Sequence, residues 1–309
     1  MEFVVCGEAL IDLVPEESVD TFRSTWGALS AGGPMNTAVG LARLGEAVQF
    51  AGRLSDDQFG RQLRAHLRAN GVGLDRAVWT SDPTSLAVVS LDEDQKATYA
   101  FHFEGTANFG WRREELAALS HDQWLHIASL STVVQPGAAV LLDWAGQHAG
   151  PVSLDINVRP SVLPEPTAYW AAVEPWLDLV GGCRGIVKAS DDDIDFLATA
   201  SGAEGSARQV MSRWCERFGF SAGVVTLGPE GAFAVDERGA ETTVPGRAVK
   251  VVDTVGAGDT FMAAFLAEFV QTGRLETALI HGVSAGAYVC GRQGPQPPNR
   301  TELAAFING

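Results

Sequence analysis

Short apolar runs alternate with amphipathic segments along most of the chain. The runs that predict buried strands are 3–6, 49–54, 124–130, 151–155, 184–188 and 222–227. The segments that predict helices are 35–44, 56–70, 137–148, 191–200, 206–218, 258–271 and 276–290. Turn residues within 228–245 predict two further short strands. The alternation indicates right-handed βαβ units, a mainly parallel central sheet and the α/β class.

One part of the chain breaks this alternation. Two apolar runs at 85–91 and 97–103 flank the polar tip 92–95, which predicts a β-hairpin without helices. Residues 13–30 also lack helical periodicity. The sequence therefore predicts a main α/β domain formed by 1–12, 31–83 and 109–309. A small β-sheet lid is predicted from 13–30 and 84–108.

Composition narrows the classes of function. The chain has 309 residues, 46% of them apolar, and a formal net charge of −16, which disfavours nucleic acid and anionic membranes as partners. The N-terminal segment is too short and too acidic for a signal peptide, and no apolar run reaches the ~18 residues of a membrane span. The four scattered cysteines predict reduced thiols, so a cytoplasmic protein is expected. None of the three lysines lies in a P-loop motif, and the H-R-D and D-F-G motifs of protein kinases are missing.

The strongest chemical signal is the segment 253–261, D-T-V-G-A-G-D-T-F. Gly256 and Gly258 precede an apolar helix, and a glycine turn at a helix N-terminus offers unpaired N–H groups to a phosphoryl group. Asp259 lies beside this anion site, where it can accept a proton from a substrate hydroxyl. The alternative is a helix-capping acid after a tight turn. A dinucleotide fingerprint fails because Phe261 replaces its third glycine.

Several segments together resemble the ribokinase-like (PfkB) carbohydrate kinases. They are 4–12, the G-G-x-x-x-N-x-A form at 32–38, then 41–45, 52–60 and 253–261. The D-x-N-x-R segment at 155–160 resembles the fructokinase and 2-keto-3-deoxygluconate kinase branch. The resemblance implies a three-layer α/β/α fold with a β-sheet lid, and transfer of phosphate from ATP to a primary hydroxyl of a small sugar. It also implies Mg²⁺ and K⁺ as cofactors.

The resemblance assigns roles position by position. Asp259 is the expected general base, beside an anion hole of Gly256, Ala257 and Gly258. The expected sugar contacts are Asp12, Gly32, Gly33, Asn36, Asn157 and Arg159. The expected nucleotide contacts are Lys188, Ser190, Thr226, Gly228, Gly231, Gly256 and Gly258. The expected monovalent-cation loop involves Asp253, Val255, Val289, Arg292, Gly294 and Pro298. As alternatives, Gly228 and Gly231 shape a hairpin, Arg159 forms a salt bridge, and the cation loop is a plain loop.

The chain departs from the family at its N-x-x-E element. Ser190 replaces the asparagine and Asp193 replaces the glutamate, so Asp193 is expected to bind Mg²⁺ through water. The alternative is an acidic helix N-terminus. Val283 or Ser284 stands where the family often has Asn or His, so adenine contacts are not predicted.

The lid residue Glu104 would repel a substrate carboxylate, which favours a neutral sugar. Fructose is ranked first, 2-keto-3-deoxygluconate second, and ribose or a nucleoside third. His102 is a candidate sugar contact or a structural histidine. A regulator that binds sugar or nucleotide on the same fold is the non-enzyme alternative, ahead of a dehydrogenase. Exposed lid strands predict a homodimer through the lid.

Overall fold

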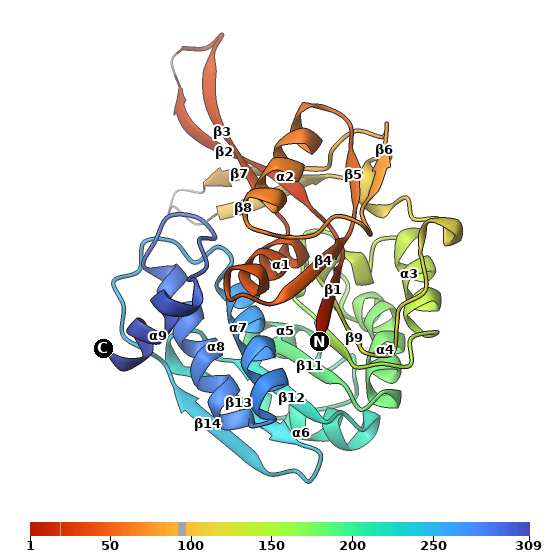
Figure 1. Cartoon of the computed structure of the whole chain (residues 1–309), viewed down its shortest axis with the longest axis vertical. Helices are drawn as coiled ribbons and strands as arrows, with labels where there is room; N and C mark the ends of the chain where they lie inside the picture. The colour runs from red at the N-terminus through yellow and green to blue at the C-terminus, as the bar shows by residue number, and fades with distance from the viewer. Residues whose placement is uncertain (19, 92–96) are drawn as a thin grey trace.

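The computed structural model describes residues 1–18, 20–91 and 97–309 (Figure 1), so the predicted hairpin tip 92–95 lies outside the described residues. Among these residues an eight-stranded sheet has the order β14-β13-β12-β11-β10-β9-β1-β4. Its strands are β1 (Glu2–Cys6), β4 (Ala47–Ala51), β9 (Gln123–Ala128), β10 (Val152–Asp155), β11 (Ile186–Ser190), β12 (Ala222–Thr226), β13 (Gly231–Asp236) and β14 (Glu241–Pro245). The pairs from β4 to β12 are parallel, and β13 and β14 are antiparallel additions. The predicted mainly parallel sheet is confirmed.

Helices cover both faces of this sheet, which completes the three predicted layers (Figure 1). One layer holds α1 (Gly33–Arg43), α7 (Ala257–Thr272), α8 (Leu275–Cys290) and α9 (Arg300–Asn308). The other holds α3 (Gly137–Ala145), α4 (Pro166–Gly182), α5 (Asp191–Leu197) and α6 (Ala207–Phe218). Each layer buries its own hydrophobic cluster against the sheet. Short 3₁₀ turns are η1 (Ala107–Phe109), η2 (Arg113–Glu115), η3 (Ser129–Thr132) and η4 (Gly228–Glu230). Across the described residues no helix combines the length and apolar character of a membrane span.

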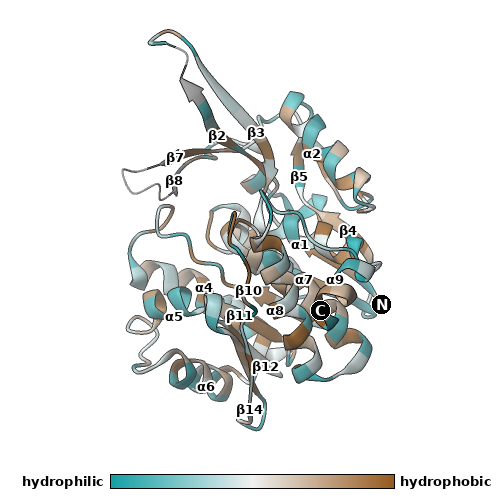
Figure 2. Cartoon of the chain, turned by 90° about the vertical axis from the view of Figure 1, so that its left-hand side faces the viewer, coloured by the Kyte–Doolittle hydropathy of each residue, from teal (hydrophilic) through white to brown (hydrophobic). Residues whose placement is uncertain are grey.

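A second, four-stranded sheet lies beyond the carboxyl end of β1, and its β2–β3 hairpin projects from the molecule (Figures 1 and 2). Its order is β3-β2-β7-β8, formed by β2 (Leu10–Ser18), β3 (Ser24–Ala31), β7 (Leu86–Leu91) and β8 (Ala97–His102). The helix α2 (Gln58–Ala69) packs on one face through Leu63 and Leu67. Beside it, β5 (Arg53–Ser55) and β6 (Val78–Thr80) form a parallel pair.

The strand register decides which residues share a face of this small sheet. Asp12 pairs with Ala87, and Ala87 pairs with Phe101, so these side chains lie on the face away from α2. His102 instead pairs with Leu86, whose side chain packs in the cluster under α2. The proposed sugar contact through His102 is therefore wrong, because strand alternation turns it to the opposite face from Asp12.

The chain crosses between the two sheets near Ala9, Ala31 and Ser85, and one side chain links two of the crossings. The amide of Asn108 accepts from the Ala9 N–H (3.3 Å) and donates to the Ala9 oxygen and the Ser85 hydroxyl (2.9 Å each). Asn108 is buried, so these bonds satisfy main-chain groups that water cannot reach. This clamp fixes the chain where it enters the small sheet.

The structure corrects several predicted elements. The predicted strand 49–54 is divided into β4 and β5 at Gly52, where a side chain would collide with the Phe50 ring. The helices α4 and α9 were not predicted. A proline inside α4 hides its helical pattern, whereas the capping box of Asn299 and Glu302 was a readable signal for α9. The helix predicted at 191–200 ends at Leu197.

Candidate active site

The carboxyl ends of the parallel strands and the N-terminus of α7 meet below the small sheet. Ligands of open α/β sheets bind outside this strand edge. Asn157 and Arg159 follow β10, Ser190 ends β11 and Thr226 ends β12. Asp259 lies in the first turn of α7. Residues distant in sequence are therefore placed at one edge, as the resemblance implied.

The start of α7 has the geometry of an anion site. Gly256 caps the helix in the left-handed conformation (φ 76°), and a Cβ there would lie 2.5 Å from Pro295. Gly258 and Asp259 occupy the first turn, where a helix leaves amide N–H groups without an intrahelical acceptor. These amides and the positive end of the helix favour a negatively charged group.

Asp259 is buried, with 8% of its surface exposed. Its carboxylate accepts a hydrogen bond from the Asn36 amide (2.9 Å). Burial raises the pKa of Asp259, opposed by the Asn36 bond and by the charges of Lys188 and Arg159. A carboxyl with a raised pKa is a better proton acceptor than an exposed one. Asn36, expected to contact the sugar, thus orients the Asp259 carboxylate.

The glycine pair lies against the base. A Cβ on Gly33 would be 3.2 Å from both the Asn157 amide nitrogen and an Asp259 carboxylate oxygen. Gly32 has a φ of 125°, and a Cβ there would be 2.6 Å from the main-chain oxygen of Glu8. The structure thus brings Gly32, Gly33 and Asn157 together with Asp259. Side chains at the glycine positions would fill the space between them.

Arg159, an expected sugar contact, acts electrostatically on Asp12 and on Asp259. Its guanidinium donates to the Val158 oxygen (2.9 Å), and among the described residues it forms no direct ion pair with a carboxylate. Its positive charge lowers the pKa of Asp12 and of Asp259. Burial has the larger effect on Asp12 and raises its pKa to about 6. The alternative of a structural salt bridge for Arg159 is not observed.

A buried ion pair lies under the anion site. The Lys188 ammonium donates to both carboxylate oxygens of Asp155 at 2.9 Å. Burial disfavours the ammonium, but the negative charges of Asp155, Asp193 and Asp259 outweigh it and raise the pKa of Lys188. A Cβ on Gly258 would lie 3.2 Å from the Lys188 nitrogen. The positive charge is therefore next to the α7 amides.

Ser190 and Asp193 form the capping box of α5. The Ser190 hydroxyl accepts from the Asp193 N–H (3.0 Å), and the Asp193 carboxylate accepts from the Ser190 and Val158 N–H groups (2.7 Å each). Both carboxylate oxygens thus bind main chain, as the acidic N-terminus alternative expects. No three described His, Cys, Asp or Glu residues are grouped as a metal site. The water-mediated Mg²⁺ role of Asp193 stays a prediction.

The expected nucleotide side consists of turns. Gly228 (φ 53°) and Gly231 (φ 103°) flank η4 between β12, which ends at Thr226, and β13. These glycines shape the hairpin, and their contact with a nucleotide stays a prediction. Val283 and Ser284 are buried in α8, and the Ser284 hydroxyl donates to Ile280 within the helix (2.7 Å). Neither residue offers a polar group to an adenine.

Asp253 ties together the loop expected to bind a monovalent cation. One of its carboxylate oxygens accepts from the Val255 N–H (3.0 Å) and the other from the Gly294 N–H (2.9 Å). The Val289 oxygen accepts from the Arg292 N–H (2.9 Å). A carboxylate with main-chain oxygens on two adjoining loops suits a cation the size of K⁺. The part of Pro298 is untested, and ion binding stays a prediction.

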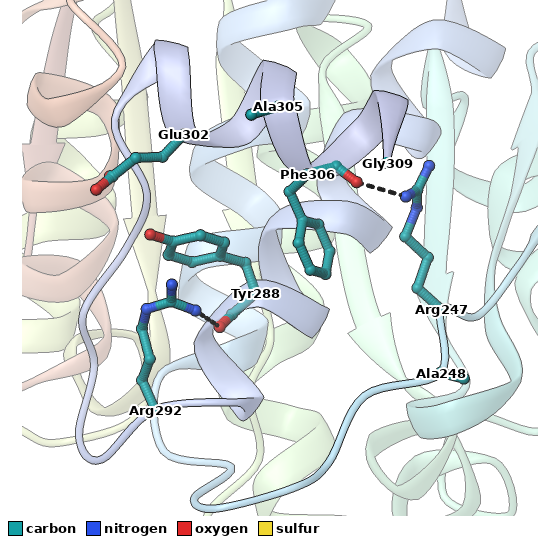
Figure 3. Close-up of a pocket in the computed structure, with 8 residues that line it drawn as sticks. All are labelled: Arg247, Ala248, Tyr288, Arg292, Glu302, Ala305, Phe306 and Gly309. Carbon is teal, nitrogen blue, oxygen red and sulfur yellow. Dashed lines mark hydrogen bonds between the residues drawn. The ribbon is translucent and has the colours of Figure 1, made fainter.

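A separate open pocket of about 750 Å³ lies by the C-terminal helix α9 (Figure 3). Its lining includes Arg247, which donates to the Phe306 oxygen (2.7 Å), and Arg292, which stacks on the Tyr288 ring at 3.4 Å. Both guanidiniums are thus held by the protein itself. Arg292 is its one lining residue that also belongs to the predicted site.

We expect Gly258→Ala to lower the rate of the expected phosphoryl transfer by at least about tenfold and to change the free energy of unfolding by less than about 1 kcal/mol, because two opposing effects on stability partly cancel. The added methyl would press on the Lys188 ammonium, which Asp155 prevents from moving, whereas alanine favours the helix by up to about 1 kcal/mol. Steady-state kinetics and urea unfolding measure the two effects. Gly182→Ala, where no atom lies within 4 Å of the new Cβ, is the matched control. Full turnover in Gly258→Ala would contradict this placement of Lys188.

Comparisons with known proteins agree with this geometry. The family model for pfkB family carbohydrate kinases matches residues 1–302. A fructokinase of Rhizobium leguminosarum bv. trifolii is 33% identical, with 94% of this chain and 86% of that protein covered. Fructokinase-1 of Oryza sativa subsp. japonica is 32% identical, with 96% and 94% covered.

Solved structures give the same result. A fructokinase double mutant from Vibrio cholerae O395, in fructose-, ADP- and potassium-bound form, has a TM-score of 0.85 at 27% identity, with 99% of this chain and 98% of that chain covered. An aminoimidazole riboside kinase from Salmonella enterica has a TM-score of 0.84 at 25% identity, with both chains covered completely. With the family signature at the base and anion site, this chain belongs to the pfkB family of carbohydrate kinases.

Proposed function

We propose that this carbohydrate kinase transfers the γ-phosphoryl group of ATP to a primary hydroxyl of fructose. The observation that carries the proposal is the buried Asp259 at the start of α7, next to unpaired amides on one side and to Gly33 and Asn157 on the other. The fructokinases among the relatives, and the Vibrio cholerae fructokinase in its fructose- and ADP-bound form, support this choice of substrates.

Proton transfer is assigned to Asp259. Its carboxylate takes the proton of the acceptor hydroxyl as the new O–P bond forms, and Asn36 holds it in orientation. The raised pKa of Asp259 increases its basicity, and the protein excludes water around it. Hydrolysis of ATP is thereby disfavoured against transfer to the sugar.

Charge stabilisation is assigned to the α7 amides and to Lys188. The amides of Gly258 and Asp259 face the charge that develops on the transferred phosphoryl group, and the Lys188 ammonium adds a fixed positive charge beside them. Mg²⁺ bound to the ATP phosphates would neutralise further charge, with Asp193 as the nearby carboxylate that orders its water. K⁺ at the Asp253 loop would hold the adjoining α7 turn, and the bound potassium named for a neighbour supports this.

The charges around the sugar side favour a neutral substrate. The half-buried carboxyl of Asp12 and the buried carboxyl of Asp259 both feel the positive charge of Arg159, so a further carboxylate from the substrate is disfavoured. Glu104, from which the repulsion was first expected, is exposed. One observation favours 2-keto-3-deoxygluconate as the second candidate: Arg159 has no direct carboxylate partner of its own among the described residues.

The small sheet is proposed as a lid over the sugar. Asp12 and Tyr99 lie on the same face of it, and the negative charge of Asp12 adds to burial in raising the pKa of Tyr99. Arg159 in the loop after β10 and Asp253 in the loop before α7 also act on the pKa of Tyr99, which supports a lid whose Tyr99 face is directed at the site. Closure of the lid would remove water from the reacting groups.

Substrate choice is tested by coupled ADP release with ATP, Mg²⁺ and K⁺ over a panel of acceptors. The panel is fructose, 2-keto-3-deoxygluconate, ribose, tagatose, adenosine and aminoimidazole riboside. We expect the highest kcat/KM for fructose, because it brings no charge to the Asp12 side. A preference for the keto acid would show that Arg159 binds a carboxylate, and would replace the fructose proposal.

We expect Asp259→Asn to lower kcat by at least about a hundredfold while ADP affinity changes less than about threefold, because the amide cannot accept the proton. Steady-state kinetics and isothermal titration with ADP measure the two quantities. Asp192→Asn, an exposed residue in the acidic first turn of α5, is the control for loss of a carboxylate. If Asp259→Asn retains turnover, the assignment of the base fails.

A homodimer through the lid is proposed from its exposed edge. The strand β3 is at the edge of the small sheet, and Phe22, Trp26 and Leu29 on this hairpin are 94%, 41% and 46% exposed. Sedimentation equilibrium should give twice the monomer mass, and Trp26→Asp should shift the molecule toward monomer. A monomeric wild type at micromolar concentration would contradict the proposal.

A further inference from the structure

Glu8 is a buried acid without a role in the chemistry described above. It follows β1 directly, at the crossing from the main sheet to the small sheet, and only 1% of its surface is exposed. Burying a carboxylate is costly unless hydrogen bonds or positive charge compensate it. The partners of Glu8 therefore indicate what it holds.

The first partner is Ser131 in the η3 turn. Its hydroxyl donates to the Glu8 carboxylate at 2.6 Å. A Cβ on Gly7 would lie 2.8 Å from the same hydroxyl. It would also lie 2.3 Å from the ring of Pro34, at the start of α1. The end of β1, the η3 turn and the start of α1 are thus in contact around this carboxylate.

Ser129, the first residue of η3, also acts on Glu8, since its hydroxyl is one of the causes that lower the pKa of that carboxyl. Its φ of 60° is in the left-handed region, which a residue with a side chain adopts only when its surroundings hold it there. The hydroxyls of Ser131 and Ser129 and the charge of Arg159 all lower the pKa of Glu8, against the larger effect of burial, which raises it. Two residues of the η3 turn therefore act on one carboxylate.

The η3 turn in turn supports the sugar side of the site. The Ser129 Cβ lies 3.6 Å from the Cβ position of Gly33, on the side where Asn157 and Asp259 approach. Asn157 also has a left-handed φ, of 46°. The two residues with left-handed φ, Ser129 and Asn157, thus both lie next to Gly33. The adjoining Gly32 lies against the main chain of Glu8.

We propose that Glu8 is a positioning residue for the sugar. Through Ser129 and Ser131 it holds the η3 turn against Gly33. In this way it fixes the position of the residues that would contact the sugar. It does not touch the base, and its contacts with the η3 turn lie on the sugar side. The proposal rests on the proposed function for the sugar side of the site, but not on the identity of the sugar.

The kinetic test compares Glu8→Gln, Glu8→Ala and Ser131→Ala with wild type, using the panel sugar that wild type phosphorylates fastest. We expect Glu8→Ala and Ser131→Ala each to raise the KM for sugar about tenfold and the KM for ATP by less than about twofold. Glu8→Gln retains an acceptor oxygen for Ser131 and should rescue most of the loss. Equal increases in both KM values, or no increase for sugar, would overturn the proposal.

A double variant tests whether Glu8 acts through Ser131. If it does, Glu8→Ala with Ser131→Ala raises the KM for sugar by about the same tenfold as either change alone. Independent roles would give about a hundredfold and overturn the proposed route. Glu115→Gln is the matched control, since Glu115 is a nearly buried carboxylate that pairs with Arg53 away from the site. It should lower stability without changing the KM for sugar.

Hydrogen exchange provides a readout that needs no turnover, so failure of the fructose proposal does not affect it. The Val133 and Val134 N–H groups both donate to the Leu130 oxygen within the η3 turn (3.1 and 2.9 Å). Their exchange should accelerate by at least about tenfold in Glu8→Ala and remain unchanged in Glu115→Gln. Wild-type protection in Glu8→Ala would overturn the proposal even if the sugar kinetics changed.

Discussion

The candidate active site depends on burying charged groups, above all Asp259 and Lys188, away from water at the N-terminus of α7. Burial raises the pKa of Asp259, which suits the proposed base, yet burial also makes its charge costly. The compensation comes from three directions: the Asn36 amide, the Lys188 ammonium and the Arg159 guanidinium. Each of these groups is fixed by a different element, so the site exists only when α1, β11 and the loop after β10 are packed in place.

Close packing explains why Gly258 and Gly33 are glycines. Gly258 leaves room for the Lys188 ammonium, and Gly33 leaves room for Asn157 and Asp259. In both cases a methyl group would occupy the space of a polar atom that the chemistry requires. The glycines are thus part of the electrostatic arrangement, because they allow charges to approach main-chain amides within hydrogen-bonding range.

The sequence predicted the features that depend on local pattern. The parallel sheet, the small sheet and most helices follow from periodicity, and the signature at 253–261 predicted the glycine turn at the start of α7 and the position of Asp259. It missed contacts between distant segments, such as the Asp155–Lys188 pair and the contact of Glu8 with Ser131. The sequence could not show that both Asp193 oxygens bind main chain, because a capping box and an acidic metal ligand give the same local sequence. The sequence shows Gly7 and Glu8 after the first strand, but no local pattern indicates that Glu8 contacts Ser131.

The connectivity of the small sheet has a consequence for how the chain folds. β2 pairs in parallel with β7, although β3, α1, β4, β5, α2 and β6 lie between them in sequence. Closing so long a loop costs conformational entropy. Packing of α1 and β4 on β1 shortens the effective loop and so lowers this cost. During synthesis the β2–β3 hairpin therefore emerges early but has no partner until β7 and β8 follow. Until β7 and β8 have been synthesised, only α2 can cover the apolar face of the β2–β3 hairpin.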